Sequence, residues 1–194
     1  MDRLIAHDRI LETLDLQSLF GNPHPVELDI GCGTGRFLIA RAMANPCLNL
    51  LGIERLLGRV RTVLAKAERH QLDNVRLLRV EASYALGFML PPASIQTIFI
   101  SFPDPWPKRR HHRRRLIQPD TVVALHRVLR PGGTVHFATD HADYFDAVGA
   151  CFQGQSDWRR GIPYQPTTEE TSSFERLWRD AGRPIFRCAW TRAD

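Results

Sequence analysis

Acidic side chains recur in this chain where short aliphatic segments end. Four of them close or follow such segments one after another: Asp29, Glu54, Glu81 and Asp104. A carboxylate only accepts hydrogen bonds, so it suits an amino group or the two hydroxyls of a ribose. If the segments are strands of one parallel sheet, these acids meet at one edge of that sheet. The spacing therefore predicts a site for a ligand that carries both an amino group and a ribose.

Three glycines follow the first acid in the stretch ELDIGCGTGRF, residues 27–37. Gly31, Gly33 and Gly35 allow a tight turn and the close approach of a ligand, because no Cβ stands in the way. Arg36 occupies the position where a dinucleotide-binding fingerprint has its third glycine or alanine. Asp29 beside the loop also disfavours a pyrophosphate. The pattern argues against NAD and favours a ligand with an amino group, with a purely structural turn as the alternative.

The next two acids complete the outline of one ligand. Glu54 ends the segment LLGIE and can accept both hydroxyls of a ribose, although a solvated acid at a strand end is the alternative. Glu81 is placed to reach an adenine amino group, although an ion pair with the nearby Arg79 competes with that interpretation. Together with Asp29 and the glycines, these acids describe a site for S-adenosylmethionine.

The segment FPDPWPKRRHHRRR, residues 102–115, joins a rigid stretch to a basic one. Its three prolines disfavour helix and remove backbone donors, which holds Asp104 in an extended segment. Eight consecutive chargeable residues then run from Lys108 to Arg115. We expect this run to hold phosphate groups and to make binding salt-dependent. A solvated helix face is the alternative, and Trp106 can either stack on a base or fill space beneath the loop.

Alternating apolar segments and periodic stretches must position these residues. Strands are predicted at 26–30, 48–53, 75–80, 97–102, 134–139 and 185–190, and helices at 35–44, 56–71, 119–129 and 141–152. The alternation is typical of an α/β fold with a parallel sheet covered by helices on both faces. We expect residues 1–194 to form a single domain, with an entry helix and connection in 1–25. The polar stretch 153–173 is predicted to be a long surface loop on the substrate side.

Composition narrows the class of protein. The formal net charge of +5 favours anionic partners. The four cysteines form no CxxC pair, and His111 and His112 are adjacent rather than at ligand spacing, so we expect no metal and a reducing cytoplasm. No apolar run approaches the ~18 residues of a membrane span, so neither secretion nor membrane insertion is expected.

Several segments together resemble the bacterial tRNA (guanine-N7-)-methyltransferase family, from about residue 26 to residue 190. They are DIGCGTG, GIE, the FPDPWPKRRHHRRRL stretch, HFATDHADYF and SSFERLWRDAG, in the order that the family has. The resemblance implies a Rossmann-like class I methyltransferase fold with a mostly parallel seven-stranded sheet. It also implies methyl transfer from S-adenosylmethionine to N7 of guanosine 46 in the variable loop of tRNA.

Carried over position by position, the resemblance assigns roles to individual residues. It implies that Asp29, Glu54, Glu81 and Asp104 contact the cofactor, and that Asp104 is also catalytic. It implies substrate binding by Lys108, by Asp140 and by a motif that falls on Ser172, Ser173, Phe174 and Glu175. The chain departs from the family at Glu81, where aspartate is usual, and at Ser173, where a lysine is lost. The chain before the core is short, so we expect no basic N-terminal arm.

The acceptor chemistry can be considered separately. Guanine N7 already carries a lone pair, so catalysis rests on alignment of the reacting atoms rather than on a general base. Three carboxylates are candidates to accept the N1–H and N2–H donors of guanine: Asp104, Asp140 and Glu175. Asp104 can instead contact the cofactor, Asp140 can instead cap a helix, and Glu175 can instead support the helix that follows. Lys108, Arg109, Arg113 and Arg114 are the candidate phosphate ligands.

Two other classes of function stay open at this point. A methyltransferase acting on a small molecule or a protein would not need the basic run and would be indifferent to added tRNA. A nonenzymatic RNA-binding module would not bind S-adenosylmethionine, although the complete set of Asp29, the glycines and Glu54 argues against it. The sequence leaves a monomer and a homodimer equally open.

Overall fold

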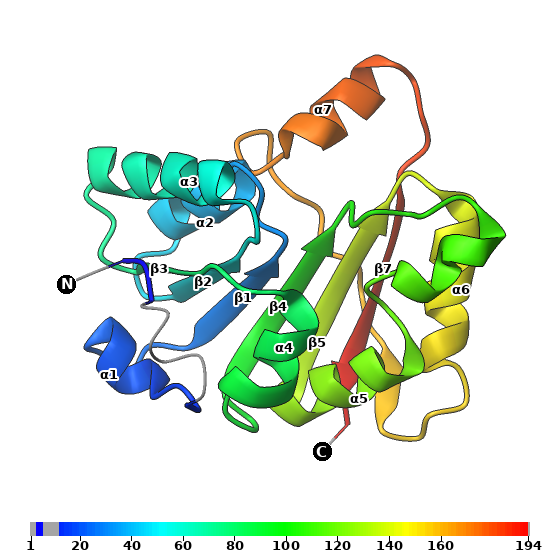
Figure 1. Ribbon diagram of the computed structural model, residues 1–194, viewed down its shortest axis with the longest axis horizontal. Coiled ribbons are helices and arrows are strands. Elements are labelled where there is room, and N and C mark those ends of the chain that lie inside the picture. Colours follow the sequence, from blue (N-terminus) through cyan, green and yellow to red (C-terminus); the bar gives the residue numbers. More distant parts are fainter. Residues whose placement is uncertain (1–2, 6–11, 194) are drawn as a thin grey trace.

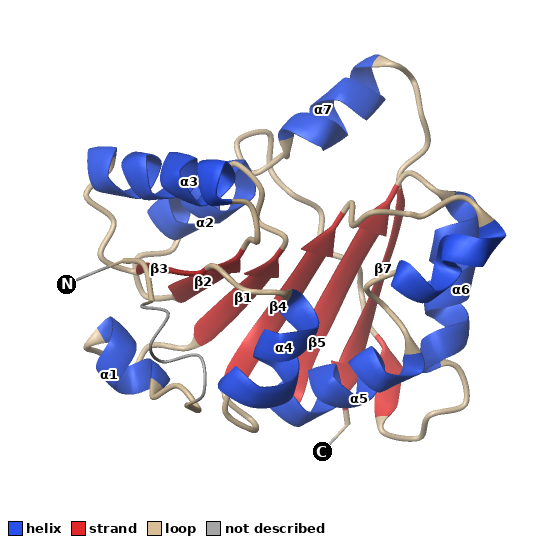
Figure 2. Ribbon diagram, in the orientation of Figure 1, coloured by secondary structure: helices blue, strands red, loops and turns tan. Residues whose placement is uncertain are grey.

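The computed structural model describes residues 3–5 and 12–193, which form a seven-stranded sheet flanked by helices (Figures 1 and 2). The strand order is β3-β2-β1-β4-β5-β7-β6. The strands are β1 (Val26–Ile30), β2 (Asn49–Ile53), β3 (Val75–Leu78), β4 (Ile95–Ser101), β5 (Leu129–Thr139), β6 (Trp158–Arg160) and β7 (Phe186–Arg192). Strands β1 to β5 are parallel, whereas β7 runs antiparallel to both β5 and β6. The predicted α/β fold with a mostly parallel sheet is confirmed.

Two apolar layers explain why the central strands are almost continuously hydrophobic. Helices α2 (Arg36–Ala44) and α3 (Leu57–Arg69) pack on one face of β2 and β3, and α5 (Pro119–Val128) and α6 (Ala142–Phe152) pack on the other face of the sheet. Every residue of β1, β2 and β3 is buried. Strands covered on both faces have no solvent side, so their sequences do not alternate. The four helices predicted between the strands are confirmed.

The N-terminal region differs from the predicted entry helix. Helix α1 (Leu16–Phe20) begins after Asp15, whose carboxylate accepts a hydrogen bond from the Ser18 amide, and it ends at Gly21. Leu4 instead forms an isolated parallel bridge with Leu77 of β3. The remaining part of the predicted helix, residues 6–11, lies outside the described residues. The apolar spacing near the N-terminus therefore reflects an extended segment at residues 3–5 in addition to a short helix.

Four further short helical elements lie in the described part of the chain. Helix α4 (Ala82–Tyr84) continues into a π-helical turn, η2 (Ala85–Met89), after β3. The basic run forms a 3-10 helix, η3 (Arg109–Arg114). Helix α7 (Ser173–Asp180) stands over the edge of the sheet at which β4 and β5 end (Figure 1).

The stretch 153–173 is only in part the long surface loop that its polarity predicts. Strand β6 lies within it, and Glu170 and Thr171 are buried. Tyr164 packs against Phe99 of β4, with ring centroids 5.2 Å apart, and its backbone amide donates to His136 Nδ1 of β5 over 3.2 Å. Part of the stretch therefore packs on β4 and β5, next to Phe37 of α2, whose ring also contacts Phe99. Local composition did not reveal this because the contacts are with strands far away in the sequence.

None of the helices in the described part of the chain is both long and apolar enough to cross a membrane.

Candidate functional site

The acids singled out from the sequence follow successive parallel strands. Asp29 lies in β1, Glu54 directly follows β2, Asp140 directly follows β5, and Glu81 and Asp104 each follow their strand, β3 or β4, by three residues. Since β1 to β5 are parallel, these positions share one edge of the sheet. The expected gathering of carboxylates at the carboxyl ends of the strands is present.

The glycine loop leaves open space beside that edge. The backbone φ angles of Gly31, Gly33 and Gly35 are 76°, 57° and 75°. These angles lie in the left-handed region, which residues other than glycine rarely adopt. A Cβ at Gly35 would lie 2.8 Å from the side chain of Val63, so this glycine also permits α2 and α3 to pack closely. At Gly31 no described atom lies within 4 Å of the Cβ position. The loop thus serves both the fold and the approach of a ligand.

Asp29 and Glu54 form a buried acidic pair next to this space, with 4% and 6% of their surfaces exposed. Burial, and secondly the charge of Glu54, raises the pKa of Asp29 to about 7. No ion pair joins Asp29 to any residue that the structure describes. A buried acid that has no cationic partner of its own, as Asp29 is among the described residues, attracts a cation, which matches a ligand with a charged amino group.

Glu54 is already oriented by its neighbours. Its Oε1 accepts the Leu56 amide over 2.8 Å, and its Oε2 lies 3.5 Å from the guanidinium of Arg59. A solvated acid at a strand end, the alternative considered for this position, is wrong because the side chain is buried. The carboxylate is held at the end of β2, where a ribose would have to approach.

Glu81 has a different environment. It is exposed and caps α4, accepting hydrogen bonds from the amides of Ser83 over 2.8 Å and Tyr84 over 3.3 Å. The alternative of an ion pair with Arg79 is wrong, since Arg79 donates instead to the Arg55 carbonyl over 3.4 Å. Glu81 therefore presents its carboxylate at the end of β3 with part of its accepting capacity already used.

The proline-rich segment after β4 is tied down at both ends. The Phe102 amide donates to the Ala138 carbonyl of β5 over 2.8 Å, and Arg115 Nε donates to the Pro105 carbonyl over 2.9 Å. Phe102 and Trp106 have positive φ of 54° and 43°, conformations that cost energy in residues other than glycine. Asp104 lies between them and is exposed. The backbone around Asp104 is therefore fixed, while its carboxylate faces solvent.

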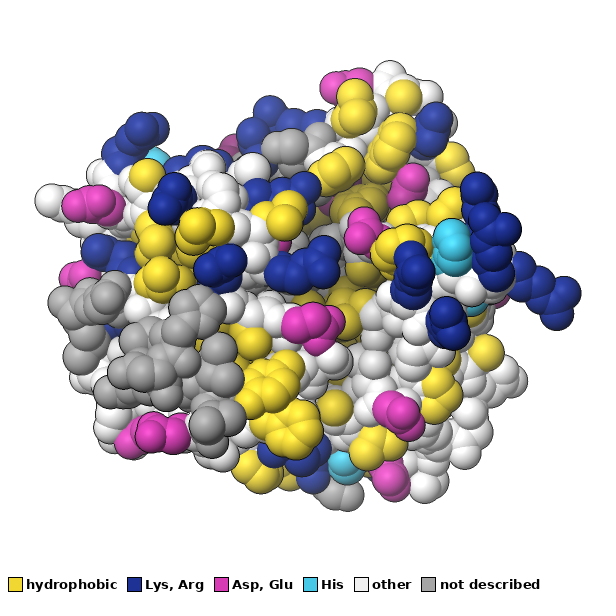
Figure 3. All heavy atoms as spheres, viewed as in Figure 1, with side chains coloured by type: hydrophobic (Ala, Val, Ile, Leu, Met, Phe, Trp, Pro, Cys, Tyr) yellow, Lys and Arg dark blue, Asp and Glu magenta, His cyan; other side chains and the backbone are white. Residues whose placement is uncertain are grey.

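The basic run divides into two roles. Lys108, Arg109, Arg113 and Arg114 are exposed, as expected for phosphate ligands, and a band of basic side chains is visible at the right of Figure 3. Arg115 instead is 4% exposed and ion-paired with Asp143 of α6. The expectation that the run contacts phosphates as far as Arg115 is therefore wrong for that residue, because its guanidinium is part of the fold.

Trp106 packs beneath the basic helix. The guanidinium of Arg114 lies 5.0 Å from its ring centroid, and the His111 ring is 5.8 Å away. The ring is half-buried by these contacts, which favours the space-filling interpretation of this residue.

Asp140 and the start of α7 frame the other side of the edge. Asp140 is half-buried but does not cap α6, since His141 occupies the cap position and its amide donates to Thr139 Oγ1 over 3.2 Å. Ser172 caps α7 by accepting the Glu175 amide over 3.1 Å. The side chain of Ser173 lies outside the described residues. Phe174 is 56% exposed on α7.

Glu175 is the most enclosed of the candidate substrate residues. It is 3% exposed, and its carboxylate pairs with Arg187 of β7 and with Arg179 one helical turn further on. Glu175 therefore does support α7, which was the alternative interpretation of this residue. It also lines a cavity of about 30 Å³ at the ends of β4 and β5. Other residues of that cavity wall are Ser101, Ala138, Ser172 and Arg187.

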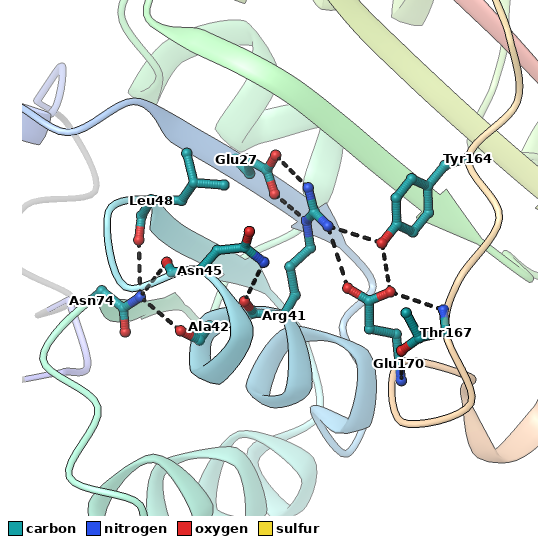
Figure 4. A network of polar contacts seen from close by, with 9 residues as sticks. All are labelled: Glu27, Arg41, Ala42, Asn45, Leu48, Asn74, Tyr164, Thr167 and Glu170. Carbon is teal, nitrogen blue, oxygen red and sulfur yellow. Dashed lines mark hydrogen bonds and ion pairs between the residues drawn. The ribbon is translucent and has the colours of Figure 1, made fainter.

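A buried charge network that the sequence analysis missed anchors the segment leading to α7 (Figure 4). Arg41 of α2 binds both carboxylate oxygens of Glu27 in β1 and contacts Glu170 over 3.3 Å. It also donates to the Tyr164 hydroxyl over 2.9 Å, and that hydroxyl donates to Glu170 over 2.5 Å. An arginine within the apolar helix RFLIARAMA, Arg41, and an acid within the apolar strand VELDI, Glu27, are the signals that could have revealed it.

His136 borders the same network as a neutral group. Burial, and secondly the charge of Arg41, lowers its pKa to about 4. Its ring stacks on Phe99 with centroids 5.3 Å apart. His136 therefore belongs to the packing beneath the cavity. Elsewhere too, the described residues contain no group of three or more potential metal ligands.

Comparison with known proteins finds a methyltransferase family model and several relatives that carry the same name. A family model described as "Putative methyltransferase" matches residues 23–188. The tRNA (guanine-N(7)-)-methyltransferase of Mycobacterium avium is 35% identical over 189 residues, which cover 95% of this chain and 73% of that protein. The protein of that name from Mycobacterium leprae is 33% identical over 193 residues, covering 97% and 84%. The one from Nocardia farcinica is 45% identical over 139 residues, 72% of this chain and only 52% of that protein.

Solved structures share the architecture. The 16S rRNA methyltransferase KamB superposes with a TM-score of 0.69 over 100% of both chains at 18% identity. The aminoglycoside resistance methyltransferase NpmB1 gives 0.62 at 18% identity, covering 94% of this chain and 95% of that one. At such identities the likeness shows the fold alone.

Proposed function

The chain belongs to the tRNA (guanine-N(7)-)-methyltransferase family, and we propose that it transfers a methyl group from S-adenosylmethionine to N7 of guanosine 46 in the tRNA variable loop. The observation that carries this proposal is the pairing of two features at one edge of the sheet. A buried acidic pair lies beside the open glycine loop, and an exposed basic helix follows the neighbouring strand. The first suits a cationic nucleoside and the second suits a nucleic acid. A tRNA substrate also places the enzyme in the cytoplasm, where its four free cysteines stay reduced.

The residues at the edge fit the cofactor. In this proposal Asp29 binds the amino group of the methionine part, Glu54 accepts the ribose hydroxyls and Glu81 reaches the adenine. Gly31, Gly33 and Gly35 provide the backbone against which the ligand lies. The fit rests on the burial of Asp29 and Glu54, on the lack of a described ion-pair partner for Asp29, and on the open space at Gly31. S-adenosylmethionine, when bound there, supplies an electrophilic methyl group on a positively charged sulfur.

The protein's own contribution is to align the acceptor. Guanine N7 needs no deprotonation, so the side chains have to hold the base rather than remove a proton. Asp104 stands on a backbone fixed at Phe102 and Pro105, next to the basic helix. From there it is positioned to orient the base, with Asp140 and Glu175 as further acceptors for the donor edge of guanine. Effective alignment of two reactants can lower a barrier by roughly 7–11 kcal/mol.

The exposed basic residues account for binding of the RNA backbone. Lys108, Arg109, Arg113 and Arg114 provide four positive charges directly after the Asp104 segment. Phosphate contacts position a nucleic acid but carry little sequence information. The choice of guanosine therefore falls to the carboxylates and to Ser172 and Phe174 at the start of α7, with Ser173 in the same motif.

The direct test uses two unmodified tRNA transcripts, one with guanosine and one with adenosine at position 46. Each is incubated with the protein and S-adenosylmethionine, and the nucleosides are identified by mass spectrometry. We expect 7-methylguanosine from the first transcript alone. 7-Methylguanosine from both would refute the target position. Methylation of neither, together with calorimetric binding of S-adenosylmethionine, would indicate a methyltransferase for another substrate, and absence of that binding would indicate a nonenzymatic RNA-binding protein.

A further inference from the structure

Glu175 has one carboxylate oxygen occupied and one free. Nη2 of Arg187 and Nη2 of Arg179 both contact Oε1. Within the described part of the chain, no hydrogen bond reaches Oε2. Because Glu175 lines the cavity at the ends of β4 and β5, Oε2 is the oxygen left for a ligand there.

Of the two arginines, Arg187 is the one fixed to the sheet. It lies in β7 opposite Ala138 of β5, and Ala138 lies opposite Ser101 of β4. This row of three residues crosses the sheet and forms one wall of the cavity. The side chain of Arg187 is 12% exposed, whereas that of Arg179, on the outside of α7, is 49% exposed. Arg187 therefore sets the position of Glu175, and Arg179 adds a solvent-screened contact.

The cavity has room for a small group rather than a whole base, and Glu175 and Arg187 give its otherwise largely apolar wall a polar part. Its volume of about 30 Å³ is room for about two water molecules. Ser101, Ser172 and Arg187 all keep part of their surface exposed, so the cavity opens to solvent. An exocyclic amino group is similar in size to water and donates the hydrogen bonds that a carboxylate oxygen accepts. Asp104 and Asp140 follow the same two strands, which places the cavity next to the expected position of the acceptor base.

We propose that Arg187 is a positioning residue that holds Glu175 so that its free oxygen accepts the 2-amino group of the target guanine. The inference rests on the proposed function and adds a specificity determinant to it. Both arginines bind the same oxygen, so Arg187 does not need the bidentate geometry of its guanidinium for this role. It does need a fixed backbone position, which β7 provides. A hydrogen bond between a charged and a neutral group corresponds to roughly a 10- to 100-fold preference for the substrate that can make it.

The test compares guanosine with inosine at the methylated position of otherwise identical transcripts. Inosine keeps N7, N1–H and O6 and lacks only the 2-amino group. We expect the wild-type protein to favour guanosine by roughly 10- to 100-fold in kcat/KM. Arg187→Met lowers kcat/KM for guanosine and leaves inosine nearly unchanged, so the ratio falls toward one. Arg187→Lys restores part of the ratio, and Arg179→Met, the matched control on the same oxygen, keeps it.

If the role of Arg187 were purely structural, Arg187→Met would lower kcat/KM equally for the guanosine and the inosine transcript. The ratio of the two kcat/KM values would then stay at its wild-type value, and this result would overturn the inference. Equal use of guanosine and inosine by the wild-type protein overturns it as well. Should Arg187→Met not fold, as judged by thermal melting and calorimetric binding of S-adenosylmethionine, the ratio for Arg187→Lys decides in the same way. If the wild-type protein methylates neither transcript, the proposed function fails and this inference fails with it.

Discussion

The Arg41 network makes a strong prediction about stability. Arg41→Met removes the guanidinium that neutralises Glu27 and Glu170, whose side chains are only 3% and 4% exposed. Breaking a buried ion pair from one side costs about 3–5 kcal/mol, because the remaining charge stays buried without a partner. For a chain of this size, each kcal/mol lowers the melting temperature by roughly 2–4 °C. We therefore expect the variant to melt roughly 6–20 °C below the wild type.

Differential scanning calorimetry at neutral pH measures this directly, and two controls isolate the cause. Arg61→Met removes an exposed arginine from α3 and should change the stability by less than about 0.5 kcal/mol. Adding Glu27→Gln and Glu170→Gln to Arg41→Met removes the stranded charges and should recover much of the loss.

Hydrogen exchange locates the effect within the structure. The amides of Tyr164 and Thr167 are hydrogen-bonded in the anchored segment, to His136 and Glu170 respectively. Their protection should fall more in Arg41→Met than that of the amides in β1. If Arg41→Met melts within about 2 °C of the wild type, or the triple variant is no more stable than the single one, the network does not contribute as argued.

The remaining predictions concern the candidate site. Asp104→Ala should keep tRNA binding, measured by filter retention, but lower kcat by on the order of 100-fold, since a small misplacement of reactants has that effect; full turnover would remove Asp104 from the site. Replacing Arg113 and Arg114 by glutamate should weaken tRNA binding and reduce the slope of log K against log salt by about 2 or more, whereas an unchanged slope would show that these arginines do not contact phosphate. Asp29 has a raised pKa of about 7 in the folded protein, whereas an aspartate in the unfolded chain has its ordinary pKa of 3.8. The folded protein therefore keeps a proton that the unfolded chain has lost, so Asp29 makes stability fall as the pH rises from about 4 to about 7. Asp29→Asn should therefore flatten the pH dependence of the melting temperature in that range and weaken S-adenosylmethionine binding in calorimetry. Binding of the cofactor's cationic group should also release protons near pH 7, seen as a dependence of the measured heat on the buffer's ionisation enthalpy.

Local patterns in the sequence determined most of the fold. The alternation of buried strands with amphipathic helices predicts the parallel sheet, because strands and helices have different hydrophobic periods. The glycine loop could be identified because glycine adopts, without the strain that other residues have, the positive φ found at Gly31, Gly33 and Gly35. The acids at the strand ends indicated one common site, because parallel strands bring their carboxyl ends to the same edge of the sheet.

Contacts between distant residues were decided by the tertiary structure alone. Arg41 and Glu170 are 129 positions apart, and nothing in the local sequence of either residue names the other. The same holds for Arg115, which looks like one more member of a basic run but is buried against Asp143. Polarity likewise predicted a surface loop at 153–173, but it could not reveal that Tyr164 and Glu170 hold part of this loop against the sheet. Which charges meet, and which carboxylate oxygen stays free, depends on how the chain packs, because an ion pair is defined by distance in space rather than along the sequence.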